Sequence, residues 1–219
     1  MLQFGDAKEL VSHSGAKLEK IRVLHQKCLN EQVVEPALLI EIKNLMENLR
    51  SALDYCASAL FEKYGRSKKA HPKVYFPYAK LSEDKNKFRA EIVDRCLPGV
   101  LGSRPDIAEK LESYQHFGNT GNWLALFIEL TNENKHQRLS PQIHKHYKMA
   151  CISGSIPPGG MVEIDLSRIP LGTSPDGTYR AIGGTWTGLE FTANGAPVLP
   201  LLEHAFTVIR SIVNELSSL

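Results

Sequence analysis

The chain lacks the features that would place it in a specialised class of proteins. Its four cysteines, Cys28, Cys56, Cys96 and Cys151, form no Cys-x-x-Cys pair, which argues against a disulfide framework and favours a reducing compartment. No apolar run approaches the length of a membrane span, and the amino terminus has no basic segment followed by an apolar one. We therefore expect a cytoplasmic protein with no membrane segment.

An excess of charge of either sign is also missing. The formal net charge is only +2 over 219 residues, far from the basic balance of a dedicated nucleic-acid coat. Any contact with a nucleic acid would have to be a local patch. With 42% hydrophobic residues the chain can bury a sizeable core, and we expect a single domain over residues 1–219.

Most of the chain has the hydrophobic spacing of helices. Apolar residues recur every three or four positions after Pro36 until Tyr64-Gly65, and the same spacing returns from Val198 to the end. Ser82, with two acids behind it, predicts another helix start. The predicted helices cover residues 6–32, 36–64, 82–96, 105–118, 123–139 and 198–217, with a loop or extended arm over 66–81.

After Pro141 the pattern changes to short β-branched and aromatic segments separated by turn formers. The predicted strands cover residues 143–153, 160–167, 178–182 and 186–192, with Gly183-Gly184 as a turn. The fold we expect is therefore mainly α. It is a bundle of five to six helices (6–140 and 198–217) with a small antiparallel β-sheet, 143–193, inserted before the carboxy-terminal helix.

The end of the 123–139 segment gathers polar side chains within two helical turns: Asn132, Asn134, Lys135, His136 and Arg138. At 100° per residue, Asn132 and His136 lie one turn apart on a flank, whereas Asn134 and Arg138 line up with the buried stripe. One interpretation is that cations cap the helix end and Asn134 bonds a nearby loop. The other is an anion or phosphate site in which His136 transfers a proton.

A second polar feature lies in the 36–64 helix, where Arg50 and Asp54 are spaced i,i+4. On spacing alone, an ordinary intrahelical ion pair is the favoured interpretation. Tyr55 follows directly.

These features combine into a resemblance. The segments Leu49–Tyr55, Phe76-Pro77, Trp123-Leu124 and Asn132–Arg138 resemble a family of uncharacterised bacterial proteins with LR-x-ALDH, FP, W-L and N-x-x-KH-x-R motifs. In that family the Arg-x4-His spacing is similar to the signature of HEPN-type helical ribonucleases of toxin–antitoxin and antiviral systems. The resemblance covers roughly residues 40–140. It implies a helical homodimer with a shared cleft that cuts RNA without a metal or cofactor.

This chain departs from the family at Tyr55, which stands where the histidine would be. A phenol is a poor general base at neutral pH. A ribonuclease would therefore use Arg50 to hold phosphate and His136 to transfer protons, with Asn132 and Lys135 in support. The alternative is a non-catalytic ligand-binding or interaction module, in which Asn134 and Arg138 form a structural network.

Two weaker features complete the set. His144 and His146 share a strand face, but without a carboxylate or cysteine at ligand spacing we expect no metal site. The stretch from Arg66 to Tyr78 interleaves cations with aromatic residues, as single-stranded nucleic-acid surfaces do. A solvated loop is the favoured interpretation of that stretch.

Overall fold

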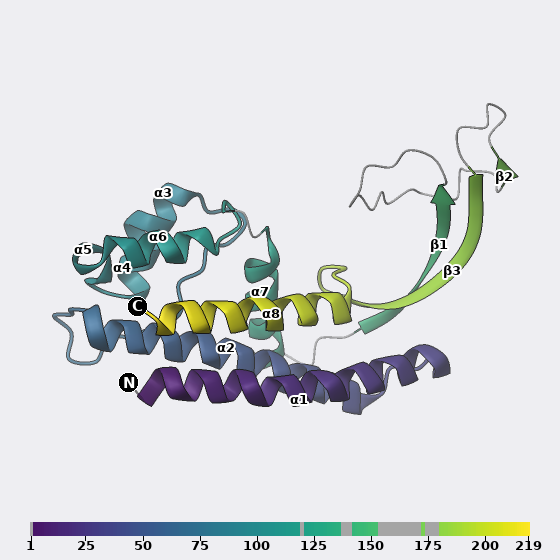
Figure 1. Cartoon of the computed structure of the whole chain (residues 1–219), viewed down its shortest axis with the longest axis horizontal. Coiled ribbons are helices and arrows are strands. Elements are labelled where there is room, and N and C mark those ends of the chain that lie inside the picture. The colour runs from purple at the N-terminus through teal and green to yellow at the C-terminus, as the bar shows by residue number, and fades with distance from the viewer. Residues whose placement is uncertain (1, 119–120, 137–141, 153–171, 174–179) are drawn as a thin grey trace.

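Three long helices form the centre of the structure, a computed structural model that describes residues 2–118, 121–136, 142–152, 172–173 and 180–219. They are α1 (Leu2–Glu31), α2 (Pro36–Tyr64) and α8 (Val198–Ser217). Each packs on the other two, and they run side by side (Figure 1). The apolar stripes read from the sequence face inward. On α2 the buried residues are Leu38, Ile42, Leu45, Met46, Leu49, Ala52, Leu53, Cys56, Ala57, Ala59 and Leu60.

Local sequence sets the ends of these helices. Pro36 occupies the first turn of α2, where its missing N–H costs nothing, and Gly65 follows the last residue. Helix α1 ends before Gln32, which has a left-handed backbone with φ of 57°. The predicted bounds of α2 and α8 are confirmed, and α1 begins earlier than the predicted Asp6.

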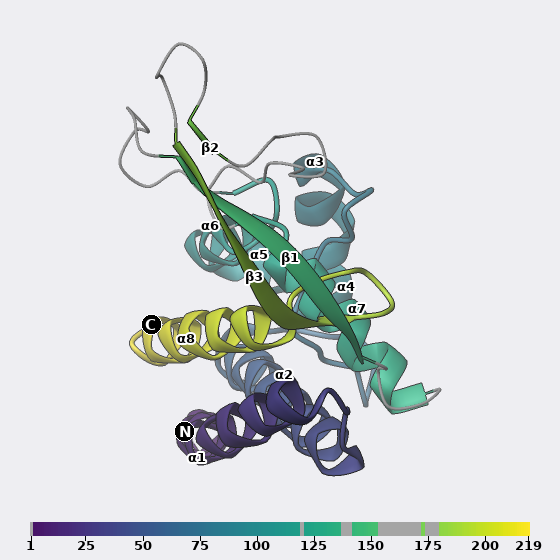
Figure 2. The same cartoon turned by 90° about the vertical axis from the view of Figure 1, so that its right-hand side faces the viewer.

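A second group of short helices lies on the side of α2 and α8 away from α1 (Figures 1 and 2). It contains α3 (Lys85–Lys87), the π-helix η1 (Phe88–Ile92), α4 (Val93–Cys96), α5 (Val100–Ser103) and α6 (Pro105–Ser113). The prediction that Ser82 caps the first of these helices is wrong. Asp84 is the cap, because its extended backbone lets its carboxylate accept the Lys87 N–H at 2.8 Å. The 105–118 helix also ends earlier, at Ser113.

Helix α7 (Trp123–His136) crosses α2 and α8 and leads to the sheet. Strands β1 (Gln142–Ile152), β2 (Gly172–Thr173) and β3 (Arg180–Phe191) pair antiparallel in the order β1-β3-β2. The ribbon of β1 and β3 leaves the bundle at the end opposite both chain termini (Figure 1). Its base is held by Leu189 and Phe191, which are buried.

The mainly α fold with an inserted antiparallel sheet is confirmed, but one predicted turn is wrong. Strand β3 runs straight through Gly183 and Gly184, which pair with Ala150 and Met149. The two predicted strands on either side of them are therefore one. The predicted strand 160–167 lies outside the described residues. In the described part of the chain, no helix has both the length and the apolar character of a bilayer span.

Two glycines give a matched test of the backbone. Gly15 lies inside α1, and a Cβ there would meet only the Phe206 ring, at an ordinary 3.5 Å. Gly15→Ala is expected to stabilise the protein by about 0.5–1 kcal/mol, because alanine loses less backbone entropy in a helix. Urea unfolding monitored by circular dichroism would measure the change.

The control is Gly99→Ala, for which the opposite sign is expected. Gly99 has φ of 79°, and an added Cβ would lie 2.8 Å from the Arg66 backbone nitrogen. We expect a loss of more than about 1 kcal/mol. Equal effects of the two substitutions would contradict the assigned backbone at both positions.

Candidate functional site

Three residues of the predicted site, Arg50, Asp54 and Tyr55, lie on α2 within two turns. The Arg50 side chain is 14% exposed, whereas Tyr55 is 41% exposed and forms no hydrogen bond to a described residue. Each residue of a helix is rotated by about 100° from the one before it. Asp54 lies one turn after Arg50 on the same side of α2, so Tyr55, the next residue, lies on a different face from Arg50. Arg50 and Tyr55 therefore do not form a joint site in the described structure.

Arg50 is held beneath the segment that follows α2. Its Nε lies 3.3 Å from Oδ2 of Asp54, and its guanidinium carbon lies 5.6 Å from the centre of the Tyr78 ring. Its Nη1 is buried and has no hydrogen-bond partner in the described part of the chain. A carboxylate and an aromatic face thus already occupy two sides of the cation that was predicted to hold phosphate.

Asp54 does more than pair with Arg50. Its second oxygen, Oδ1, accepts the backbone N–H of Phe76 at 2.9 Å. The i,i+4 ion pair expected from spacing is therefore present, and the same carboxylate joins α2 to a residue 22 positions later. The LR-x-ALD and FP elements of the sequence meet at this contact.

The segment is held again just beyond Phe76. Gln115, which is 1% exposed, accepts the Ala79 N–H at 2.8 Å and donates to the Pro77 carbonyl oxygen at 3.3 Å. The Tyr75 N–H donates to the Cys96 carbonyl oxygen at 3.4 Å. Residues 75–79 are consequently fixed against both helix groups.

The nearby thiols are poor nucleophiles. Burial raises the pKa of Cys96, although the positive charges of Arg95 and Arg50 oppose the shift. Burial raises the pKa of Cys56 to about 12, against the opposing positive charge of Lys8. Both side chains are therefore protonated at neutral pH, and the thiolate is the reactive form.

We call residues 66–74 the basic loop, and hydrogen bonds also hold the chain where this loop begins. The Arg66 N–H donates to the Pro98 carbonyl oxygen at 2.8 Å, and the Ser103 hydroxyl donates to the Tyr64 carbonyl oxygen at 2.7 Å. The loop lies at the end of the molecule where α2 finishes, opposite the β-ribbon (Figure 1). It is a short span of chain held at both ends.

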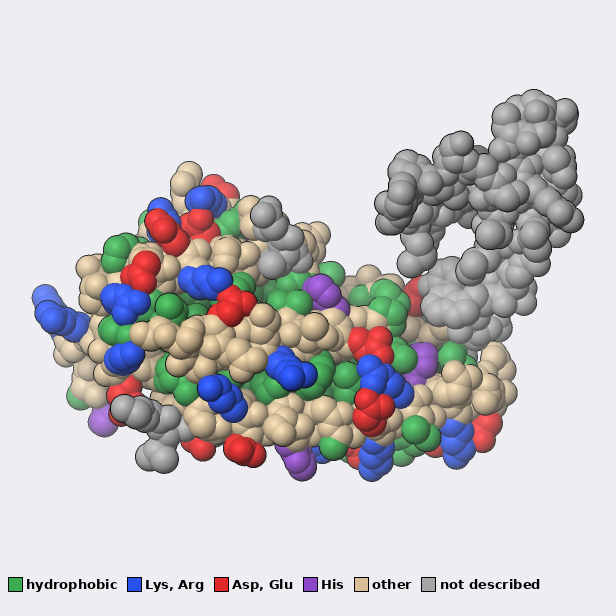
Figure 3. Space-filling model, viewed as in Figure 1, with side chains coloured by type: hydrophobic (Ala, Val, Ile, Leu, Met, Phe, Trp, Pro, Cys, Tyr) green, Lys and Arg blue, Asp and Glu red, His purple; other side chains and the backbone are tan. Residues whose placement is uncertain are grey.

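The basic loop concentrates positively charged side chains that form no ion pair with the residues that the structure describes. Between Lys63 and Ser82 the sequence contains no aspartate or glutamate. Within the loop Arg66, Lys68, Lys69 and Lys73 are all exposed, and none forms an ion pair with a described residue. Figure 3 shows Lys and Arg side chains projecting at this end. By contrast, Lys85 on α3 and Arg104 between α5 and α6 are paired at 2.7 Å with Glu112 and Asp106.

Aromatic residues border the same loop. Tyr75 is 48% exposed, and Tyr64 is stacked by two cations, with Lys63 at 4.9 Å and Arg104 at 4.5 Å from the ring centre. These cations, Lys63 first, lower the pKa of the Tyr64 hydroxyl. The surface thus offers charge and flat rings together, which is the combination that single strands need.

The predicted cluster on α7 is described only in part. Asn132 is exposed. The side chains of Asn134, Lys135 and His136 lie outside the described set, as does the whole of Arg138, so the convergence of His136 with Arg50 stays a prediction. Among the described residues, no group of three potential metal-ligating side chains comes together.

Sequence spacing alone did not identify the basic loop as the favoured site. The signal that would have found it is the run of twenty residues without a carboxylate, read together with its six Lys and Arg residues. No family model, curated protein or solved structure matches the chain. The resemblance to a HEPN-like family and the homodimer it implies stay predictions.

Proposed function

We propose that this protein binds single-stranded RNA through the basic loop, and that the Arg50–Asp54 pair positions the loop rather than cleaving the RNA. The supporting observation is the set of four exposed cations that have no ion-pair partner among the described residues. In a chain with a net charge of only +2, this is the local patch that a nucleic-acid contact requires.

The hydrogen bonds that anchor the loop favour a binding surface over a loop that only contacts solvent. Ordering a flexible segment on binding costs free energy. Here the Pro98 carbonyl at one end and Asp54 at the other fix the loop before RNA arrives. Exposed Tyr75 is placed to stack on a base, a contact worth about 1–3 kcal/mol that every base can make.

The environment of Arg50 supports binding without cleavage at that residue. Its guanidinium is largely buried against Asp54 and Tyr78, and the histidine of the Arg-x4-His signature is Tyr55 here. The positive charge of Arg50 therefore interacts with Asp54 and the Tyr78 ring within the fold. RNA is expected to be recovered intact after incubation with the protein, and cleavage that depends on Arg50 would overturn this part of the proposal.

The test is a variant with Arg66, Lys68, Lys69 and Lys73 changed to glutamine, assayed by fluorescence anisotropy on labelled oligouridylate. Each lost phosphate contact lowers the salt slope of single-strand binding by about 0.7. Loss of four contacts lowers the slope by about 2.8 and, at 0.1 M salt, weakens binding roughly 600-fold.

The matched control removes cations that are already paired: Lys20, Lys27, Lys43 and Lys85, whose partners are Glu41, Glu35, Glu47 and Glu112. The net charge falls by the same amount in both variants. If both weaken RNA binding equally, the attraction is a property of the whole protein and the basic loop is not the site. Binding to anionic lipid vesicles but not to RNA would also overturn the proposal.

A further inference from the structure

A groove runs along the surface between α1 and α8, with a volume of about 470 Å³. Polar residues form its two rims, with Lys8 and Ser12 on α1 and Arg210 and Asn214 on α8. Each pair is spaced i,i+4, so each rim is one row of a helix. The groove therefore has two facing polar rows along its length.

The charged side chains that line this groove are both positive. Lys8 and Arg210 are exposed, and neither forms an ion pair with a described residue. No aspartate or glutamate lines the groove. Ser12 and Asn214 add neutral hydrogen-bond donors beside the two cations. These side chains together suit a ligand that carries negative charge along its length.

The floor of the groove is apolar. Val11 and Val213 are buried there, and Phe206 is half-buried at one end. Gly15 has no side chain to fill the space beside Phe206, whose ring lies 3.5 Å from the position of a Cβ on that residue. An aromatic ring at the floor and cations on the rims are the features of a single-strand binding groove.

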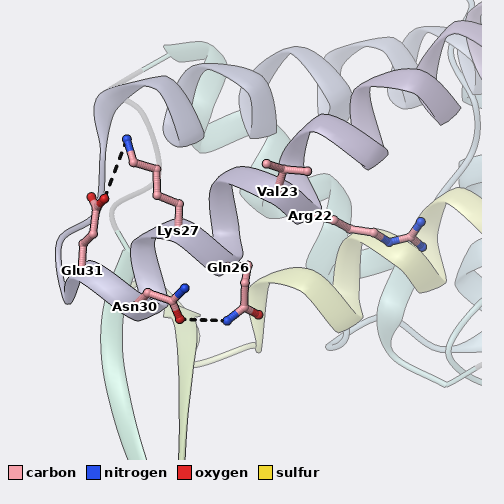
Figure 4. A pocket seen from close by; sticks show the side chains of 6 residues that line it. All are labelled: Arg22, Val23, Gln26, Lys27, Asn30 and Glu31. Carbon is pink, nitrogen blue, oxygen red and sulfur yellow. Dashed lines mark hydrogen bonds and ion pairs between the residues drawn. The ribbon is translucent and has the colours of Figure 1, made fainter.

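A second hollow, on α1, differs from the groove because its cations do form ion pairs. It is lined by Arg22, Val23, Gln26, Lys27, Asn30 and Glu31 (Figure 4). Its cations are paired, since Lys27 lies 2.7 Å from Glu35 and Arg22 lies 2.7 Å from Glu203. The unpaired cations thus distinguish the α1–α8 groove from its neighbour.

The groove and the basic loop belong to the same end of the molecule. The Lys63 amine and the Tyr64 hydroxyl at the end of α2 both donate to the Leu219 carbonyl oxygen, at 3.1 Å and 2.8 Å. At 1.5 Å per residue, Asn214 lies only about 8 Å along the chain axis from that contact. The end of α2, where the basic loop begins, thus lies beside the end of α8, whose residues Arg210 and Asn214 line the groove.

We propose that the α1–α8 groove continues the RNA site, so that a strand bound at the basic loop runs on between Lys8 and Arg210 with a base against Phe206. This inference rests on the proposed function. It specifies an extended single strand longer than the loop alone can contact. A duplex is excluded as the preferred ligand, because its bases are not free to reach the floor.

The test compares a 6-nucleotide with an 18-nucleotide oligouridylate on a Lys8→Gln/Arg210→Gln variant. Two lost phosphate contacts are expected to lower the salt slope for the 18-mer by about 1.4 and to weaken its binding roughly 25-fold at 0.1 M salt. Binding of the 6-mer at the basic loop is expected to be unchanged. The control is Arg22→Gln/Lys27→Gln in the neutralised hollow, which should leave both oligonucleotides unaffected.

The outcomes separate the two proposals. If the basic-loop variant weakens binding but the groove variant leaves the 18-mer unchanged, the groove is not part of the site and the proposed function stands. If the basic-loop variant has no effect, the proposed function fails whatever the groove does. Cross-linking of an 18-mer that carries 4-thiouridine is expected to label Phe206. Labelling confined to the basic loop would overturn the groove assignment independently of affinity.

Discussion

Replacing Asp54 by alanine is expected to destabilise the protein by about 2–4 kcal/mol. The substitution removes the only carboxylate that pairs with Arg50 among the described residues, and the guanidinium is 14% exposed. Breaking a buried pair costs about 3–5 kcal/mol, and the 32% exposure of Asp54 lowers that figure through solvent screening. The backbone N–H of Phe76 also loses its acceptor.

The control for Asp54→Ala lies on the same helix at the same spacing. Lys43 and Glu47 pair at 2.8 Å, but both side chains are about one-third exposed, at 31% and 32%. Glu47→Ala is expected to cost only a few tenths of a kcal/mol. Urea unfolding of both variants measures the difference. A loss below about 1 kcal/mol for Asp54→Ala would mean that the carboxylate does not anchor the loop.

Asp54→Asn separates the two roles of the carboxylate. The amide oxygen can still accept the Phe76 N–H, but the charge opposite Arg50 is gone. We expect a destabilisation between zero and that of Asp54→Ala. If the asparagine variant is as unstable as the alanine variant, the ion pair carries the whole effect and the contact to Phe76 contributes nothing.

The contrast between these two ion pairs shows what spacing alone can predict. Both pairs are visible in the sequence as i,i+4 matches, and both form. Spacing gives no sign that only one of them also accepts a hydrogen bond from Phe76, because that contact depends on the path of a loop with two prolines. The helix pattern predicts which side chains share a face. It does not predict which residues from elsewhere in the chain pack against that face.

The helices themselves were predictable because hydrophobic periodicity is a local property. The bounds of α2 follow from Pro36, Gly65 and the apolar stripe between them. The glycine pair in β3 shows the limit of that approach. Gly183 and Gly184 have the composition of a turn, yet a strand ladder needs only their backbone groups, and the partners in β1 supply them.

The second large effect is expected at Gln115, a residue that the sequence does not single out. Its side chain bonds the Ala79 N–H, the Pro77 carbonyl oxygen and the Leu111 carbonyl oxygen at 2.8, 3.3 and 2.9 Å. Gln115→Leu keeps the volume but removes all three contacts. Each buried polar group left without a partner costs about 1–3 kcal/mol, so a loss of about 2–4 kcal/mol is expected.

Gln26→Leu is the matched control, because Gln26 is exposed and bonds only Asn30, at 3.0 Å, among the contacts described. It should change the free energy of unfolding by less than about 0.5 kcal/mol. Amide hydrogen exchange gives a more local measurement. In Gln115→Leu the Ala79 amide is expected to exchange much faster than in the parent protein, since its acceptor is lost. Unchanged protection of that amide would show that the segment beyond the basic loop is held by packing of Phe76 and Ala79 alone, and that the hydrogen bonds of Gln115 are dispensable for positioning the loop.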